Sequence, residues 1–302
     1  MSAARELPTR RLQAGARVLE LGSRPLLMGI VNASPDSFSD GGRNTTLEQR
    51  VVLAEELVAA GAAIVDVGGE SASTGRPPVA VEQEIKRVAP LVARIVELGV
   101  LVSVDTYKPE VARAAIAAGA GIVNDVSGLR DTELASVCAQ SGAALVVMHT
   151  RAAPRERLQD ADLYDDVTAD VLAFLRERIA VALDAGVREE QLIVDPGPDF
   201  AKTPAQTIRL LGEVERLHEL ERPLLMAISR KDFIGALTGR APRERLAGTL
   251  AALAHGLDAG AQIFRVHDVA AAADFIAVRE ALSGAVQPSE RLALADELRH
   301  ER

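Results

Sequence analysis

The chain has 302 residues and a formal net charge of −9, and it is 48% hydrophobic but only 3% aromatic. The chain is acidic and has no cluster of Lys and Arg interleaved with aromatic residues. It therefore lacks the basic surface that is typical of nucleic-acid-binding proteins. Cys138 is the single cysteine, which excludes an internal disulfide and a metal site built from cysteines. Its helix-like setting favours a buried core role over that of a nucleophile. No apolar run approaches the roughly 18 residues of a membrane span, so we expect a soluble, cytoplasmic protein without membrane contact.

Eight short apolar runs follow one another along the chain, and each ends in polar residues. They cover residues 26–32, 63–69, 101–106, 121–125, 144–149, 192–197, 224–229 and 262–268. A helix-like stretch follows each run, most clearly at 51–60, 110–118 and 243–257. Eight strand–helix units in a chain of this length predict an α/β fold, a (β/α)8 TIM barrel that forms a single domain over residues 25–283.

Two segments fall outside this pattern. Residues 1–24 form an N-terminal arm that is expected to fold as a short hairpin against the bottom of the barrel. Residues 284–302 form a charged C-terminal tail, for which we expect a solvated helix. Neither segment carries a pattern that indicates chemistry.

The polar residues at the strand ends are predicted to converge, because the carboxyl ends of all eight strands share one face of a barrel. They are Asn32, Asp105, Asn124, His149, Asp195, Lys231, Arg265 and His267. Asp195 precedes Pro-Gly, a turn that leaves its carboxylate at the barrel mouth. Two carboxylate oxygens suit the paired N–H donors of a planar heterocycle. The alternative is an aspartate that only caps the next helix or pairs with a neighbour.

Lys231, Arg265 and His267 bring positive groups to the last two strands. The loops after these strands often form a phosphate site in barrels, which favours an anionic ligand over simple pairing with acids such as Asp268. Loop 33–44 is polar and Gly-rich and carries Phe38, a residue placed to close over a flat substrate. Loop 70–79 carries Arg76. The alternative for both is an ordinary surface loop.

Eight motifs in order carry a specific resemblance to the dihydropteroate synthase family. They are MGIVNASPDSFSDGG, DVGGES, SVDTYKPEVARAA, GIVNDVSG, VVMHT, DPGPDFAKT, SRKDFIG and FRVHDV, spread over residues 26–282. The resemblance implies a transferase of folate biosynthesis that condenses 6-hydroxymethyl-7,8-dihydropterin pyrophosphate with p-aminobenzoate, giving 7,8-dihydropteroate and pyrophosphate. It also implies Mg²⁺, a homodimer and sensitivity to sulfonamides. The Ala- and Leu-rich segments 243–257 and 270–282 offer apolar faces for a dimer contact.

The resemblance also implies roles for the strand-end residues. Asp105, Asn124, Asp195 and Lys231 would hydrogen-bond the pterin edge, with Met148 packed against the ring. Arg265 would stack on the pterin and, with His267 and Asn32, hold the pyrophosphate and its Mg²⁺, with Asn32 as the metal ligand. The carbon becomes cation-like as pyrophosphate departs. The negative charge of the leaving pyrophosphate must therefore be neutralised by a metal and cationic side chains. Asp105, Lys231, Arg265 and His267 are accordingly the expected catalytic group.

Two stretches depart from the common family pattern on the acceptor side, ESASTGR and SRKDFIG, and DPGPDFAKT also differs from it. The family commonly reads ESTRPGA, SRKSFIG and DPGIGFGKT, whereas this chain reads ESASTGR, SRKDFIG and DPGPDFAKT, which places Ala72, Ser73 and Asp232 where Thr, Arg and Ser are usual. We expect Asp232 to repel the acceptor's carboxylate by about 1–2 kcal/mol after screening, unless Arg76 restores positive charge. The alternative is that Asp232 turns outward and caps its helix. Two other functions remain open on these residues: a pterin-binding paralogue without synthase activity, and a pterin-dependent methyl-transfer domain.

Overall fold

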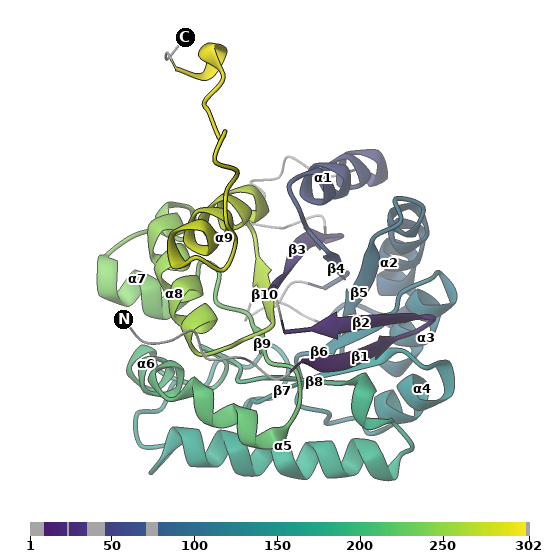
Figure 1. Ribbon diagram of the computed structural model, residues 1–302. Coiled ribbons are helices and arrows are strands. Elements are labelled where there is room, and N and C mark those ends of the chain that lie inside the picture. Colours follow the sequence, from purple (N-terminus) through teal and green to yellow (C-terminus); the bar gives the residue numbers. More distant parts are fainter. Residues whose placement is uncertain (1–8, 23, 35–45, 71–77, 300–302) are drawn as a thin grey trace.

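In the computed structural model, which describes residues 9–22, 24–34, 46–70 and 78–299, eight parallel strands form one closed sheet (Figure 1). The strands are β3 (Leu26–Asn32), β4 (Ile64–Gly68), β5 (Leu101–Asp105), β6 (Ile122–Asp125), β7 (Ala144–Met148), β8 (Leu192–Asp195), β9 (Leu225–Met226) and β10 (Ile263–Val266). Consecutive strands from β3 to β8 pair in parallel, and β10 pairs with both β3 and β9. A parallel bridge between Val194 and Leu224 closes the ring. The predicted TIM barrel is confirmed.

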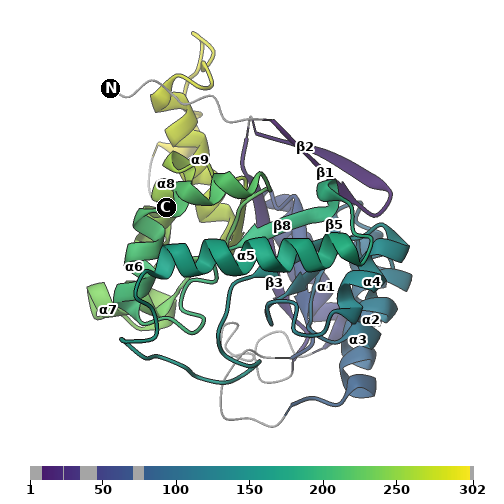
Figure 2. The same ribbon diagram turned by 90° about the horizontal axis from the view of Figure 1, so that it is seen from below.

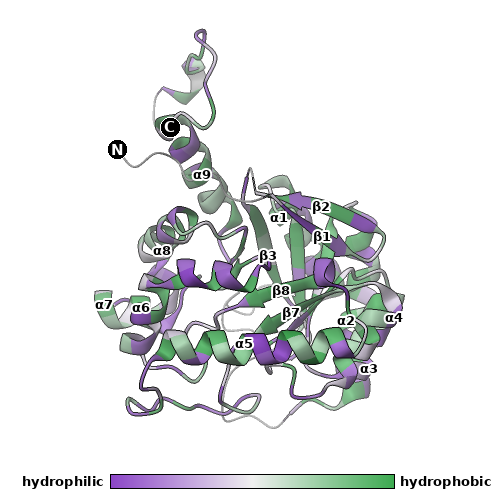
Figure 3. Ribbon diagram, turned by 60° about the horizontal axis from the view of Figure 1, so that its bottom comes forward, coloured by the Kyte–Doolittle hydropathy of each residue, from purple (hydrophilic) through white to green (hydrophobic). Residues whose placement is uncertain are grey.

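Helices surround the barrel and turn their apolar faces toward the strands (Figure 3). They are α1 (Leu47–Ala59), α2 (Val81–Val96), α3 (Pro109–Ala117), α4 (Glu133–Ser141), α5 (Val167–Asp184), α6 (Pro204–Gly212), α7 (Asp232–Thr238), α8 (Leu246–Asp258) and α9 (Val269–Ser283). Short 3-10 turns cover Glu189–Gln191, Val214–Leu220, Pro242–Glu244 and Asp296–Leu298. Local sequence sets several starts: Thr46 and Gln49 cap α1 reciprocally, and Asp166 accepts two N–H bonds at α5.

An N-terminal hairpin closes the amino-terminal end of the barrel. Strands β1 (Arg10–Ala14) and β2 (Arg17–Leu21) pair antiparallel and lie across that end (Figure 2). Leu12 and Leu21 are buried in one apolar cluster with the first residues of the barrel strands, such as Met28 and Ile64. Burial of such a side chain contributes roughly 1.5–3 kcal/mol, so the hairpin completes the core at the end opposite the strand carboxyl termini.

The C-terminal tail differs from the prediction. Helix α9 ends at Gly284, which adopts the left-handed conformation, and the chain then extends away from the barrel with only the 3-10 turn at Asp296–Leu298 (Figure 1). The solvated helix expected there is wrong for residues 284–299. Pro288 interrupts the segment and Leu292 is 75% exposed, so no packing offsets the unfavourable nucleation of a short helix.

Two further expectations can be examined in the structure. Cys138 is fully buried, and burial raises the pKa of its thiol to about 12, as befits a core residue. Within the described residues, no helix has the length and apolar character that a membrane span needs. The cytoplasmic location stays a prediction.

Candidate active site

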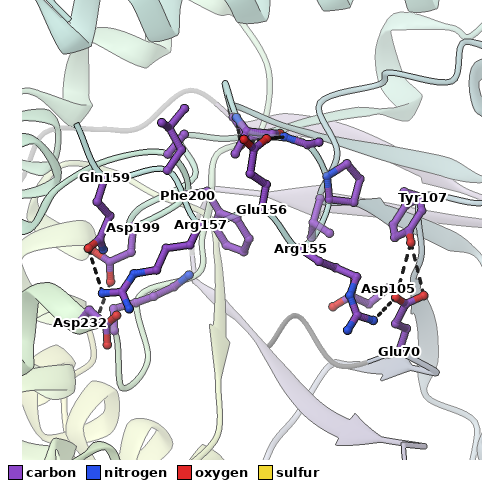
Figure 4. A pocket seen from close by; sticks show the side chains of 18 of the residues that line it. Glu70, Asp105, Tyr107, Arg155, Glu156, Arg157, Gln159, Asp199, Phe200 and Asp232 are labelled. Atoms are coloured by element: carbon purple, nitrogen blue, oxygen red, sulfur yellow. Dashed lines mark hydrogen bonds and ion pairs between the residues drawn. The ribbon is translucent and has the colours of Figure 1, made fainter. Parts of the chain in front are cut away.

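A cavity of about 370 Å³ lies at the carboxyl-terminal ends of the barrel strands. Its walls come from the end of β5, the loop after β7, the loop after β8 and the start of α7. Asp105 and Lys231 line the cavity directly, together with the aromatic rings of Tyr107 and Phe200. Figure 4 shows two groups of side chains at its opposite ends, one around Glu70 and the other around Asp199.

The strand register brings the predicted polar residues together. Asp105 pairs with Asn124 across β5 and β6, and Met148 pairs with Asp195 across β7 and β8. Asn32, at the end of β3, pairs with Gly68, which in turn pairs with Asp105. Asn124, Met148 and Asp195 are almost fully buried and are not among the residues that line the cavity. We call this layer of strand-end side chains, behind the lining, the floor.

Arg265 on β10 is the centre of this floor. Its Nε donates to Asp66 Oδ2 at 2.7 Å and its Nη2 donates to Asp105 Oδ2 at 3.0 Å. Asn124 Nδ2 also donates to Asp66 Oδ2, at 3.2 Å. A guanidinium that binds two carboxylates is held in one orientation by strong charge-assisted bonds.

Asp66 is a site residue that is not among those predicted. It is fully buried in the middle of β4, and its Oδ1 has no hydrogen-bond partner among the residues that the structure describes. The prediction considered only the ends of the apolar runs. The available signal was a charged residue inside such a run, because a buried carboxylate persists only with a cationic or hydrogen-bonding partner.

Burial raises the pKa values of two carboxylates at the strand ends, Asp105 and Asp195. The pKa of Asp105 rises to about 7, because burial and the negative charges of Asp66 and Glu84 outweigh the attraction of Arg265. Burial raises the pKa of Asp195 to about 6, against the opposing effects of the Gly197 N–H and Lys231. Such shifts in a cavity are typical of groups that bind or exchange protons. At pH 7 Asp195 is mainly an ionised acceptor.

The turn after Asp195 requires glycine. Gly197 adopts φ +63°, and a Cβ there would lie 2.0 Å from the carbonyl oxygen of His149. The turn delivers the Gly197 N–H to Asp195 Oδ1 at 2.7 Å. The other oxygen of Asp195 makes no hydrogen bond within the described part of the chain, so it is available to a ligand donor.

Positive charge comes from Lys231 and Arg265 but not from His267. Lys231 Nζ lies 4.3 Å from the ring centroid of Phe200. His267 Nδ1 lies 3.0 Å from Ser229 Oγ, and burial with Arg230 and Arg265 lowers its pKa to about 3. Burial therefore favours a neutral imidazole at His267, where the sequence led us to expect a positive one. Asp268, the alternative partner for Arg265 and His267, instead pairs with Arg230 at 2.8 Å.

His149 follows β7 and does not line the cavity, contrary to the expectation that it shares the pocket. It is fully buried, with Nε2 3.0 Å from Asp170 Oδ1 and Nδ1 2.7 Å from Lys202 Nζ. Lys202 is also fully buried and donates to the carbonyl oxygens of Gly197 (2.9 Å) and Phe200 (3.0 Å). This pair therefore anchors the loop after β8, a role that no local pattern indicated.

Asp232 lines the cavity at the start of α7, where Arg245 binds its carboxylate. Its side chain is 62% exposed and accepts from Arg245 Nη1 at 3.1 Å. It does not cap α7. The carboxylate of Asp199 does so, with Oδ2 accepting the N–H groups of Asp232 (2.5 Å) and Phe233 (3.4 Å).

The remaining predicted residues of the acceptor side cannot be placed. Phe38, Arg76, Ala72 and Ser73 lie outside the described residues.

A buried charge network forms the other end of the cavity. Lys108 Nζ donates to Glu70 Oε2 at 2.6 Å and to Glu84 Oε2 at 2.5 Å. Arg155, from the loop after β7, pairs with Glu70 across the cavity, and the Tyr107 hydroxyl donates to the same carboxylate at 3.3 Å (Figure 4). These bonds tie the loop after β7 to the end of β4.

The protein side chains alone do not form a metal centre. Among the described residues there is no group of three or more His, Cys, Asp or Glu side chains that could hold a metal ion. Asn32 offers one amide oxygen at the end of β3, beside β10, which carries Arg265. Mg²⁺ is commonly bound through one or two protein oxygens together with substrate phosphates, and the amide oxygen of Asn32 fits a site that the substrate completes.

Comparisons with known proteins agree on one family. Residues 28–267 match the family described as pterin binding enzyme. The chain is 44% identical over 256 residues to a dihydropteroate synthase of Streptococcus pyogenes, covering 83% of this chain and 93% of that protein. It is 45% identical to Xanthomonas albilineans dihydropteroate synthase solved with 4-aminobenzoic acid, with a TM-score of 0.83 over 91% of this chain and 98% of that one. The same enzyme solved with 7,8-dihydropteroate superposes with a TM-score of 0.80 at 44% identity, over 90% and 98% of the two chains.

Proposed function

The chain belongs to the dihydropteroate synthase family of pterin-binding enzymes, and from this premise we propose how its own residues hold the two substrates. The reaction is the transfer of the pterin methylene group from pyrophosphate to the amine of p-aminobenzoate. One observation carries the proposal: five polar side chains lie together near the carboxyl ends of the strands, two of them, Asp105 and Lys231, line the cavity, and the buried Asp195 has a carboxylate oxygen without a hydrogen bond in the described part of the chain. The five are Asp105, Asn124, Asp195, Lys231 and Arg265.

The pterin ring occupies the floor. Asp195 accepts hydrogen bonds from the N–H donors of the pterin edge. A buried carboxylate oxygen without a partner contributes most binding free energy to a ligand that donates the hydrogen bond it lacks. Asn124 and Asp105 complete the edge, Lys231 donates to a ring acceptor, and Met148 packs against the ring. Arg265 stacks on its face while Asp66 and Asp105 hold the guanidinium in place. The ionised form of Asp105 stabilises the positive charge that develops at the reacting carbon.

The pyrophosphate binds beside Asn32, Arg265 and His267. Arg265 supplies the permanent positive charge, and the neutral His267 donates a hydrogen bond to a phosphate oxygen. Asn32 would hold Mg²⁺ through its amide oxygen. When bound, Mg²⁺ neutralises the leaving group's charge. The donor chemistry supports this placement, since a single amide oxygen suits an ion whose other ligands come from phosphate and water.

The alternative functions are less well supported. The matched relatives are named as synthases and cover the catalytic barrel end to end. A methyl-transfer domain has no pyrophosphate to bind, which would leave the cationic end of β10 without a role. The acceptor is p-aminobenzoate, bound with its amine toward the floor.

The active form is a homodimer. Helices α7, α8 and α9 expose Leu237 (68%), Leu246 (37%), Val278 (60%) and Leu282 (83%), apolar side chains that gain from burial against a second copy. Sedimentation at micromolar concentration should give a species of twice the 31.9 kDa chain mass. A 32 kDa species alone would refute the dimer.

The reaction itself is tested with purified protein, 6-hydroxymethyl-7,8-dihydropterin pyrophosphate, Mg²⁺ and p-aminobenzoate. We expect dihydropteroate and pyrophosphate in equal amounts. A control without p-aminobenzoate should release no stoichiometric pyrophosphate. Absence of dihydropteroate under all conditions would refute the assignment of the site.

A further inference from the structure

One wall of the cavity carries a carboxylate of the chain itself. This wall, which we call the α7 wall, consists of Asp199, Phe200, Lys231 and Asp232. Asp199 Oδ2 accepts the first two N–H groups of α7, and its Oδ1 is buried with no hydrogen-bond partner among the described residues. A negative charge with one unpaired, buried oxygen projects a stronger field than a solvated one, because water screens it less.

The loop that carries Asp199 is held firmly. Asp199 adopts φ +65° and donates its N–H to Thr207 Oγ1 at 3.0 Å. Ala201, also at positive φ, offers its carbonyl oxygen to the Tyr164 hydroxyl at 2.8 Å. The buried Lys202 binds two carbonyl oxygens of the same loop. Non-glycine residues persist at such φ values only where the surroundings fix them, so the carboxylate is a permanent feature of the wall.

The orientation of the acceptor follows from the chemistry. Its amine must reach the pterin methylene group above the floor, so the substituent para to the amine points toward the rim. Phe200 offers the aromatic face on which a benzene ring can stack, and it is the neighbour of Asp199. Figure 4 shows Asp199, Asp232 and Arg157 together at this end of the cavity.

The backbone donors beside the para substituent are occupied, although cations also lie at this end. The first N–H donors of α7 are already used by Asp199, and Asp232 is neutralised by Arg245. The cations that line this end include Arg157, Arg230 and Lys231; Arg230 pairs with Asp268, and Arg157 donates to Gln159 at 3.1 Å. An incoming carboxylate therefore meets a resident carboxylate where backbone donors would otherwise receive it.

We propose that Asp199 is a specificity-determining residue that disfavours acceptors with a para carboxylate relative to neutral ones. The inference rests on the proposed function, because it assumes that the acceptor binds along Phe200. A neutral arylamine such as p-aminobenzamide keeps the ring and the nucleophile but lacks the repelled charge. Its use as acceptor relative to p-aminobenzoate isolates the effect of Asp199 from every step that the two acceptors share.

The experiment compares kcat/KM for p-aminobenzoate and p-aminobenzamide in the wild type and in Asp199→Asn. Asn tolerates positive φ and keeps an oxygen for the α7 N–H groups, so the loop should be preserved. The ratio of the two acceptors should rise in favour of p-aminobenzoate by about tenfold, or about 1.4 kcal/mol. Asp199→Gly, which suits φ +65° and frees the donors, should raise the ratio further.

Asp232→Asn is the matched control, because it removes the adjacent carboxylate that faces Arg245. Its ratio should stay within twofold of the wild type. An unchanged ratio in both Asp199 variants, with product still formed, would overturn the inference alone. A shift in Asp232→Asn but not in Asp199→Asn would also overturn it. Failure of the wild type to make any product with either acceptor would instead refute the proposed function.

Discussion

The floor of the cavity and its α7 wall show two different ways of placing a charged side chain. The floor residues Asp66, Asp105, Asn124, Asp195 and Arg265 come from strands, whose parallel register and alternation direct them inward. The wall residues come from a loop and a short helix, where positive φ values and contacts from distant residues decide the direction.

This difference explains what each region does. Floor side chains are bound to one another, so their geometry exists before a ligand arrives, as pterin recognition requires. The wall can change by substitution without disturbing the barrel, because loops tolerate change better than the elements they connect. We therefore expect pterin binding to be set by the floor and acceptor preference by the wall.

The largest expected effect is that of metal removal, which should separate pyrophosphate binding from binding of the pterin edge. Removal of divalent metal with excess EDTA should abolish turnover, because the pyrophosphate charge is no longer neutralised. Binding of the pyrophosphate-free pterin, measured by calorimetry, should stay within twofold, because the pterin edge is bound by side chains. Full turnover in EDTA would contradict the role given to Asn32 and Mg²⁺.

Arg265→Met should lower kcat/KM by about 100- to 1,000-fold. The change removes the cation that binds Asp66 and Asp105, and breaking one partner of a buried ion pair costs about 3–5 kcal/mol, less here because Arg265 is 21% exposed. Steady-state kinetics with urea unfolding should show losses of both activity and stability. Arg176→Met is the matched control, since its ion pair with Glu219 is half exposed and should contribute little. Equal effects of the two substitutions would contradict the central place of Arg265.

A smaller effect is the pH dependence of pterin affinity. Burial raises the pKa of Asp195 to about 6, so the acceptor form is present at pH 7 and is lost as the pH falls through 6. Affinity should drop about tenfold between pH 7 and pH 5 through this group. Asp195→Asn should make the dependence shallower, while Asp199→Asn should leave it unchanged. Calorimetry across this range that shows the same slope in all three proteins would exclude Asp195 as the titrating acceptor.

The same contrast determines what can be predicted from sequence. The sequence predicts Asp105, Asn124 and Asp195 because each follows a buried apolar run. The end of such a strand fixes both where the polar side chain lies and which way it points. Asp66 lies inside such a run, and its partner Arg265 is 199 residues away. The residues around Asp66 in the sequence therefore do not indicate this ion pair.

The wall was predicted less well, for physical reasons. Asp232 has the sequence of a helix cap, but Lys231 takes the cap position and Arg245, 13 residues later, binds the Asp232 carboxylate. Asp199 reaches the start of α7 from 33 residues earlier in the chain. Its direction depends on a backbone conformation that is rare for aspartate. Contacts of this kind depend on the folded loop and have no local periodicity.

The most direct test of this division is the dissociation constant of the pyrophosphate-free pterin for Asp195→Asn and Asp199→Asn, measured by calorimetry beside the wild type. Both substitutions exchange a carboxylate for an amide, one at the end of β8 and the other in the loop that follows it. In Asp195→Asn an NH₂ group opposes the pterin donors, which should cost about 2–4 kcal/mol, a loss of roughly 30- to 1,000-fold. Asp199→Asn should stay within twofold of the wild type. Unchanged affinity in Asp195→Asn, or an equal loss in both variants, would contradict the account.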